Sequence, residues 1–380
     1  MIYLDNAATT LYKPEPVRKA VYEAMGTMGN SGRGAWGPAL LASRLVYSVR
    51  EKAAEFFGAW GGESVAFTGN ATEALNIAIG GLVKKGDHVI TTQAEHNSVL
   101  RPLYRKEKEG AELTILPVDQ KGNFSLEEME KAVRENTRAV ICTHASNVTG
   151  NLYPAEQIGK LCRRHGLLFI LDAAQSAGEA PIDMRKMYID VLCFTGHKGL
   201  MGPQGTGGIC VDPQVKIPAF KVGGSGILSF DREHPGCMPE ALEAGTLNIH
   251  GLAGLEAAFD YLQDTGLEKI MEYENRLAEI FYEKIRKIPG VEVYGDFSLP
   301  GRTAVVSLNV AGFTSKEAGD LLAQRYEIAT RAGVHCAPLI HQALGTMERG
   351  TLRFSFSRFN TEEEIHRAAL AVKEIAGERE

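Results

Sequence analysis

The sequence predicts an α/β protein with two domains, and three observations support this. Short runs of apolar and β-branched residues alternate with helical patterns up to about residue 250. This alternation is typical of a mostly parallel sheet covered by helices on both faces. Beyond Gly251 the pattern changes to long helical stretches with separate strand runs, and the length of 380 residues exceeds what one ordinary core requires.

The first part of the chain contains seven strand-like runs. They span residues 64–68, 88–92, 112–118, 138–144, 167–172, 190–196 and 207–211. The helical patterns between them include 72–83, 155–166 and a segment that Ser125 and Glu128 would open as a capping box. Strands joined in this way run parallel, so we expect their carboxyl ends to meet at one edge of the sheet.

The second part predicts a smaller α+β domain. A long helical stretch begins near Gly251, continues through 267–288 and joins the two domains. Strand runs follow at 291–295, 304–310 and 351–357, with helices at 316–326 and at the C-terminal end. The sequence shows no internal repeat and no low-complexity linker.

Composition and charge argue against several classes of protein. The chain is 44% apolar and 23% charged, as in soluble globular proteins, and its net charge of −6 gives no electrostatic footprint for nucleic acid. No apolar run approaches the ~18 residues of a membrane span, and "MIYLDNAATT" lacks the features of a signal peptide. We therefore expect a cytoplasmic protein with neither a nucleic-acid nor a membrane partner.

The six cysteines have no Cys-x-x-Cys spacing, so a disulfide framework is not expected. Four of them lie in strand or helix patterns, where cysteine packs as a small hydrophobe: Cys142, Cys162, Cys193 and Cys210. Cys237 and Cys336 lie in loop patterns and are the candidates for reactive thiols.

Polar residues follow five of the predicted strands. The turn from Gly69 to Thr72 leads into a helix whose free N–H groups favour a phosphate. The other strand ends carry His96, Asn147, Asp172 with Gln175, and Thr195 with His197 and Lys198. Each residue alone has a plain structural explanation, such as helix capping. Because ligands of open α/β sheets bind at this edge, their convergence predicts a binding site.

Pyridoxal phosphate (PLP) fits these residues. Asp172 follows four apolar residues, so its carboxylate needs a cationic partner. Lys198 cannot easily fill that role if it is to react as a neutral amine. The cofactor brings a pyridinium nitrogen for Asp172, an aldehyde for Lys198 and a phosphate for the turn from Gly69 to Thr72.

The same cofactor gives roles to the neighbouring residues. His96 would stack on the ring and Gln175 would bind its phenolic oxygen. Thr195 and His197 would add donors for the phosphate. The glycines that follow Lys198 would let the backbone approach the cofactor.

These residues lie in motifs that resemble those of class V PLP enzymes of fold type I, and most closely the cysteine desulfurase and selenocysteine lyase family. The matching stretches are "YLDNAATT", "TGNATEALN", "EHNSVLRP", "SNVTGN", "LDAAQSAG", "FTGHKGLMGPQGTG", "EAGTLN", "RAGVHCAP" and "TLRFSFSRFNT". The resemblance implies a large domain (12–250) with a mostly parallel seven-stranded sheet and a small α+β domain (1–11 and 251–380). It also implies a homodimer that takes part in sulfur transfer such as iron–sulfur cluster assembly.

The resemblance implies the following roles. Lys198 would bind the cofactor covalently, with His96 stacked on the ring and able to move protons. Asp172 and Gln175 would tune the ring, and Ala71, Thr72, Thr195 and His197 would lie at the phosphate together with Thr246 of the other subunit. Arg353 would bind the substrate carboxylate, with Asn147, Ala7 and Ala8 nearby.

The implied reaction converts L-cysteine, or L-selenocysteine, to L-alanine and leaves a persulfide on Cys336. An acceptor protein or a small thiol would then take the sulfur. Three features depart from the family pattern: Val334 stands beside His335 where several relatives have two histidines, Ala71 stands where some have a hydroxyl, and the segment from Cys336 to Arg353 is short. The short segment resembles that of the cysteine desulfurase subgroup in which the segment carrying the cysteine is restrained.

Other readings of the sequence remain open. A selenocysteine lyase or cysteine sulfinate desulfinase, or another class V aminotransferase or lyase, would share the cofactor residues, and Cys336 discriminates among them. "HCAPLIH" offers His335, Cys336 and His341 as metal ligands, but no fourth ligand follows, so we expect no metal. The presence of Lys198 and Arg353 disfavours a non-catalytic binding protein.

Overall fold

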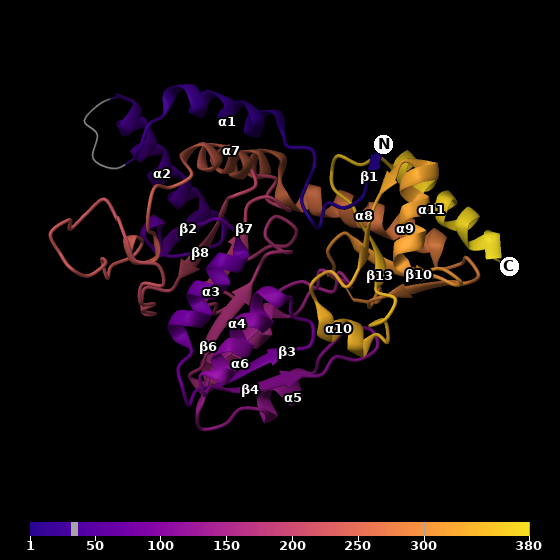
Figure 1. The fold of residues 1–380 in the computed structure, drawn as a ribbon, viewed down its shortest axis with the longest axis horizontal. Helices are drawn as coiled ribbons and strands as arrows, with labels where there is room; N and C mark the ends of the chain where they lie inside the picture. The colour runs from indigo at the N-terminus through magenta and orange to yellow at the C-terminus, as the bar shows by residue number, and fades with distance from the viewer. Residues whose placement is uncertain (32–36, 300, 380) are drawn as a thin grey trace.

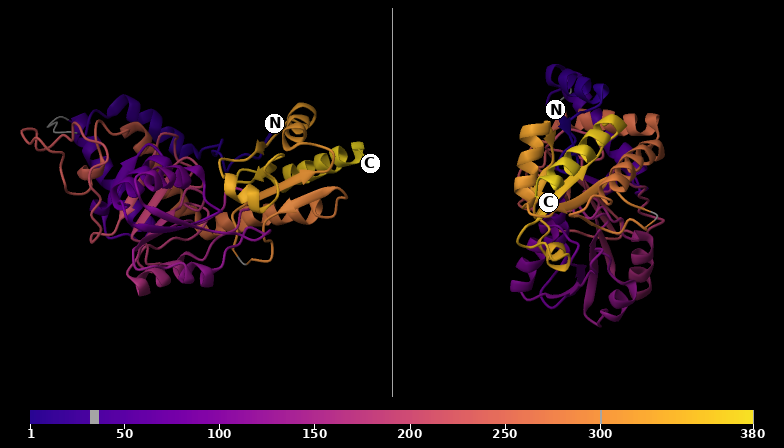
Figure 2. Two further views of the ribbon diagram at one scale, coloured as in Figure 1. Left: turned by 60° about the horizontal axis from the view of Figure 1, so that its bottom comes forward. Right: turned by 90° about the vertical axis from the view of Figure 1, so that its right-hand side faces the viewer.

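A computed structural model describes residues 1–31, 37–299 and 301–379. The chain folds into two lobes (Figure 1), an α/β lobe from the first two thirds of the sequence and a smaller lobe from the C-terminal third. Figure 2 shows the same two lobes side by side from another direction. No helix among the described residues has the length and apolarity to cross a membrane.

The large lobe is built on a seven-stranded sheet. Its strands are β2 (Val65–Thr68), β3 (His88–Thr92), β4 (Glu112–Leu116), β5 (Thr137–Thr143), β6 (Leu168–Asp172), β7 (Val191–Thr195) and β8 (Gly207–Val211). Their order is β2-β8-β7-β6-β5-β3-β4. β8 runs antiparallel to both of its neighbours, and the other pairs are parallel. The predicted mostly parallel sheet is confirmed, and each predicted strand run supplies one of its strands.

Helices cover both faces of this sheet. One face packs against α2 (Gly37–Phe56), α5 (Leu126–Lys131), α6 (Ala155–His165) and α7 (Ile249–Thr265). The other packs against α3 (Ala71–Leu82) and α4 (Asn97–Lys108). Along β6, Phe169 and Leu171 enter the first core and Ile170 the second, which is why the run is continuously apolar. α1 (Glu15–Thr27) lies along α7 (Figure 1).

The small lobe contains an antiparallel sheet in the order β12-β13-β10-β9. Its strands are β9 (Val291–Tyr294), β10 (Val305–Val310), β12 (Arg331–Gly333) and β13 (Thr351–Ser355). The helices are α8 (Leu267–Ile285), α9 (Ser315–Tyr326), α10 (Pro338–Ala343) and α11 (Glu362–Ala376). β1 (Ile2–Tyr3) pairs with β11 (Ile328–Ala329), and Ile2 and Leu4 join the core of this lobe. Short 3₁₀ turns occur at η1 (Gly62–Ser64), η2 (Glu240–Leu242) and η3 (Gly377–Arg379).

Two local expectations differ from the structure. The long connecting helix is two helices, α7 and α8, because Gly266 adopts a left-handed conformation (φ +87°) that ends α7. Leu255 and Phe259 of α7 belong to the core of the large sheet, which favours grouping α7 with that lobe; the predicted boundary at residue 251 stays a prediction. At α5, the Ser125 hydroxyl accepts from the Glu128 amide at 3.3 Å, but this is one half of a capping box.

Candidate active site

A cavity opens at the carboxyl ends of the parallel strands. Nine of the predicted site residues line it: Ala71, Thr72, His96, Asn147, Asp172, Gln175, Thr195, His197 and Lys198. They come from the ends of five strands and the turns that follow them. The strand-end pattern in the sequence therefore located one shared cavity.

Lys198 lies in the loop that follows β7. Burial, and then the positive charge of Arg353, lowers the pKa of its amine to about 8, while the charge of Asp172 opposes the shift. The Lys198 carbonyl accepts hydrogen bonds from the Thr10 hydroxyl and from the Met201 amide at 2.8 Å, so the backbone is held on both sides. An amine with this pKa is about one tenth neutral at pH 7, far more than an ordinary lysine, and the neutral form can react with an aldehyde.

Two glycines near Lys198 have a role in packing the backbone, and the expected approach of the glycines after Lys198 to the cofactor stays a prediction. A Cβ atom on Gly199 would lie 2.7 Å from the Ala177 carbonyl oxygen, and one on Gly178 would lie 2.3 Å from the Gly199 carbonyl carbon. These two glycines let the Lys198 loop pack directly against the segment after β6. The close approach that they allow is between two protein backbones.

Asp172 ends β6 with its side chain buried. Its Oδ1 accepts from the Ala174 amide at 2.9 Å, and no described residue forms an ion pair with it. Burial raises the pKa of the Asp172 carboxyl, an effect that the Ala174 amide and the charge of Lys198 oppose. A cationic ligand atom beside Asp172 would offset the cost of burying this charge.

His96 is the N-cap of α4. Its Nδ1 accepts from the Ser98 amide at 3.0 Å, which assigns the proton of the neutral ring to Nε2. Burial, followed by the charge of Lys198, lowers the pKa of His96 to about 4. The ring is therefore a neutral, flat surface at the edge of the cavity, as stacking on an aromatic cofactor requires.

The N-terminus of α3 faces the same cavity. Asn70 caps the helix by accepting from the Glu73 amide at 3.0 Å. Within the described part of the chain, the amides of Ala71 and Thr72 form no hydrogen bond. These N–H groups and the helix dipole suit a phosphate.

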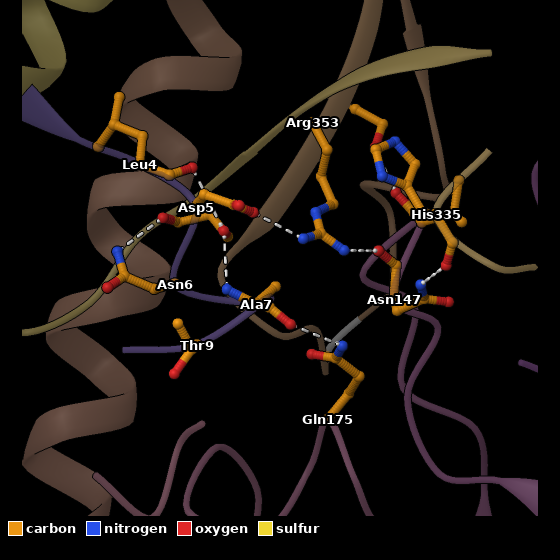
Figure 3. A network of polar contacts seen from close by, with 12 residues as sticks. Leu4, Asp5, Asn6, Ala7, Thr9, Asn147, Gln175, His335 and Arg353 are labelled. Carbon is orange, nitrogen blue, oxygen red and sulfur yellow. Dashed lines mark hydrogen bonds and ion pairs between the residues drawn. The ribbon is translucent and has the colours of Figure 1, made fainter. Parts of the chain in front are cut away.

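Arg353 lies on β13 with its side chain 1% exposed. Its Nη2 donates to Asp5 Oδ1 at 2.8 Å and its Nη1 to the Asn147 carbonyl oxygen at 3.0 Å (Figure 3). Nε has no partner among the described residues. Arg353 thus connects the N-terminal segment to the cavity-lining Asn147 and keeps donors for a further anion.

Cys336 lies in a strained turn. His335 and Cys336 both adopt left-handed conformations (φ +48° and +57°), and the Ala337 amide donates to the Val334 carbonyl oxygen at 2.9 Å. These features define a type I′ turn, which normally favours glycine or asparagine. Cys336 is exposed at this turn.

Two contacts hold the Cys336 turn against the cavity walls. Asn147 Nδ2 donates to the His335 carbonyl oxygen at 2.7 Å (Figure 3), and the Asn97 amide donates to the Cys336 carbonyl oxygen at 2.7 Å. Because Asn97 follows His96, the turn is fixed beside two of the segments that form the cavity.

Several predicted site residues do not line the cavity at the carboxyl ends of the strands. The Ala7 amide donates to the Ser355 hydroxyl oxygen, and the Ala7 carbonyl oxygen accepts from Gln175 Nε2 at 3.1 Å. The Ala8 amide donates to the Asp5 carbonyl oxygen. Gln175 therefore binds the N-terminal segment. Thr246 lines a different hollow, next to α2.

Three residues near the site were not identified from the sequence. Arg331, half-buried on β12, is the register partner of Arg353, and its charge contributes to the lowered pKa values of Lys198 and His96. Asp5 pairs with Arg353, and Glu95 lies buried directly before His96. They lie in the motifs "YLDNAATT", "EHNSVLRP" and "RAGVHCAP", but their burial and pairing depend on the tertiary fold.

The histidine and cysteine side chains of "HCAPLIH" are not arranged as a metal site. His335 Nε2 contacts Thr351, and His341 Nδ1 contacts the Thr346 hydroxyl at 2.7 Å. Over the residues that the structure describes, no group of three or more His, Cys, Asp or Glu side chains is arranged to hold a metal ion.

The chemistry of the donor set fits PLP. The cavity combines a buried amine, a buried carboxylate without an ion-pair partner, a neutral imidazole and a helix N-terminus with free amides. These groups match the aldehyde, the pyridinium nitrogen, the ring and the phosphate of the cofactor.

Comparison with known proteins identifies the family of this chain. The family model for class V aminotransferases matches residues 2–368. A probable cysteine desulfurase of Methanothermobacter thermautotrophicus is 36% identical, with 99% of this chain and 95% of the relative covered. A probable cysteine desulfurase of Pyrococcus abyssi is 34% identical, with 96% and 92% covered.

Solved structures lead to the same family. The apo cysteine desulfurase from Thermococcus onnurineus superposes with a TM-score of 0.93 at 34% identity, covering 99% of this chain and 95% of the other. The cysteine desulfurase CsdA from Escherichia coli gives a TM-score of 0.88 at 29% identity, covering 99% and 94%. The predicted cofactor, PLP, is the cofactor of this family. The chain therefore belongs to the class V aminotransferase family and groups within it with the cysteine desulfurases.

Proposed function

We propose that this enzyme is a PLP-dependent cysteine desulfurase that converts L-cysteine to L-alanine and forms a persulfide on Cys336. The observation that carries the proposal is the exposed Cys336, held on a fixed turn beside the segments of His96 and Asn147. A class V aminotransferase needs no thiol at this place. The high similarity to cysteine desulfurases over nearly the whole chain supports the same function.

The proposed mechanism assigns each step to a residue of the site. Arg353 binds the substrate carboxylate through its remaining N–H groups, and the neutral amine of Lys198 accepts the α-proton. Bound PLP supplies an electron-withdrawing ring that stabilises negative charge at the α-carbon. The Cys336 thiolate attacks the substrate sulfur, so that an S–S bond forms, the Cβ–S bond breaks and alanine is released after proton return.

A product assay tests this function. Incubation with L-cysteine should yield alanine and protein-bound persulfide, whereas an aminotransferase would yield a keto acid. Alanine formed from L-selenocysteine or cysteine sulfinate, with none from L-cysteine, would indicate the lyase or desulfinase function instead.

We also propose a homodimer in which Thr246 of each subunit reaches the partner's phosphate site. Thr246 lies in a hollow next to α2, away from the cavity of its own chain. Large apolar side chains are exposed nearby on the helices, including Tyr22 (80%) and Met25 (63%) on α1 and Tyr47 (67%) on α2. Exposed apolar surface of this kind is typical of a contact between proteins. Sedimentation would test the dimer, and Thr246→Ala should weaken cofactor binding.

The sulfur acceptor is proposed to be a protein or a small thiol that approaches Cys336 at the surface of the molecule. The exposure of the thiol and its fixed turn support this direction of transfer. A cytoplasmic location stays a prediction.

A further inference from the structure

Glu95 is a buried carboxyl group to which the mechanism gives no role. It lies between β3 and α4, directly before His96, and its side chain is fully buried. Among the described residues, no cationic side chain pairs with it. A carboxylate in this position would carry a large desolvation cost that nothing offsets.

The surroundings of Glu95 can hold a neutral carboxylic acid, although each of its hydrogen-bond partners can also donate to a carboxylate. Oε2 accepts from the Thr143 amide at 2.8 Å, and Oε1 lies 2.7 Å from the Thr92 hydroxyl oxygen. The Cys142 thiol also lies within hydrogen-bond reach of this carboxyl group. Since hydroxyl oxygen and thiol sulfur can each accept a hydrogen bond, the proton of a neutral Glu95 has an acceptor.

Asp172 lies on β6, the strand next to β5. Thr143 of β5 is the register partner of Asp172 on β6, and its amide donates to Glu95. Two carboxyl groups therefore flank one residue, and ionisation of both would place like charges close together in a buried region. Asp172 lines the cavity with Lys198, whereas Glu95 does not. Burial, with a smaller effect from the charge of Asp172, raises the pKa of Glu95 to about 8, and the hydrogen bonds from Thr92, Thr143 and Cys142 oppose this shift.

We propose that Glu95 is a positioning residue that, as a neutral acid, fastens the His96 segment to the end of β5 and leaves Asp172 as the anion beside the cavity. The fastening follows from its contacts, because Glu95 spans from the Thr92 turn to the Thr143 amide while His96 is the next residue. Its neutrality preserves a single negative charge for the pyridinium nitrogen of the cofactor.

Substitution by glutamine tests this proposal. Glu95→Gln is neutral at all pH values, and it keeps an acceptor for the Thr143 amide and a donor for Thr92. At about pH 6 we expect its Tm, cofactor content and kcat/KM to stay close to the wild type, within about twofold for kcat/KM. Glu95→Ala should lower all three. Glu272→Gln, an exposed substitution on α8, serves as the matched control.

Two readouts distinguish a neutral acid from a merely structural carboxylate. The pKa of Glu95 in the folded protein (about 8) lies above the ordinary value of 4.5 for a glutamate. The wild type should therefore lose Tm relative to Glu95→Gln as pH rises from about 5 to about 8. The infrared difference spectrum of apoprotein, wild type minus Glu95→Gln, should contain the C=O band of a protonated carboxylic acid at about pH 6. Absence of that band, or a Glu95→Gln variant as impaired as Glu95→Ala, would overturn the proposal.

Discussion

Replacement of Arg353 by lysine should reduce catalytic efficiency while leaving cofactor binding intact. The guanidinium has five N–H donors, of which two are used by Asp5 and the Asn147 carbonyl oxygen. Three donors remain, enough for a two-point contact with a carboxylate. Lysine has three donors, so one remains once the same two acceptors are satisfied.

The magnitude follows from this difference of one charged hydrogen bond. Such a bond contributes about 1.5 to 3 kcal/mol, so kcat/KM for L-cysteine should fall by a factor of about 10 to 150. Alanine formation measures kcat/KM, and absorbance of bound PLP measures cofactor content. Arg349→Lys, at an exposed arginine that pairs with Glu292, is the control and should match the wild type. Unchanged kcat/KM in Arg353→Lys, or loss of activity in proportion to lost cofactor, would refute this role of Arg353.

Four further predictions concern the cavity and the Cys336 turn. Lys198→Ala should bind PLP without a covalent bond, so borohydride reduction followed by peptide mapping should find no label, whereas the wild type should be labelled at Lys198. Cys336→Ala should form no alanine from L-cysteine but keep activity with L-selenocysteine or cysteine sulfinate, and Cys237→Ala should match the wild type in both assays; full alanine production by Cys336→Ala would favour the aminotransferase or lyase function. Cys336→Gly should be more stable than Cys336→Ala by about 1 kcal/mol in calorimetry, because glycine adopts the left-handed conformation without strain. The pKa of His96 (about 4) lies below the ordinary value of 6.5 for a histidine, so the stability of the apoprotein should fall as pH drops from 6.5 to 4. His96→Asn, which keeps the helix cap, should flatten part of this decline in Tm, and an unchanged decline would contradict a buried neutral ring.

The cavity could be predicted from the sequence because the ends of parallel strands share one edge of a sheet. Asp172, Lys198 and His96 each follow an apolar run, so local patterns were enough to group them. Arg353 and Cys336 follow no strand of the large sheet, and the sequence placed them through the resemblance alone. Their contacts with Asn147 depend on how the small lobe packs against the large one.

Other features were beyond sequence patterns for physical reasons. The left-handed turn at Cys336 uses histidine and cysteine where such turns favour glycine or asparagine, so turn chemistry did not reveal it. Gly266 lies within a helical pattern and ends α7 through its backbone conformation. In the sequence pattern, Glu95 resembles an ordinary polar residue. Its burial arises from the packing of β3 against β5.

The clamped turn has a kinetic consequence under the proposed function. With the carbonyl groups of His335 and Cys336 both held by hydrogen bonds, the sulfur carried by Cys336 can move little further than rotation of one short side chain permits. The two half-reactions then form a ping-pong cycle in which the second begins with a bimolecular encounter at the protein surface. When acceptor is scarce, the enzyme should accumulate in its persulfide form, so acceptor concentration rather than cysteine supply would set the rate of turnover.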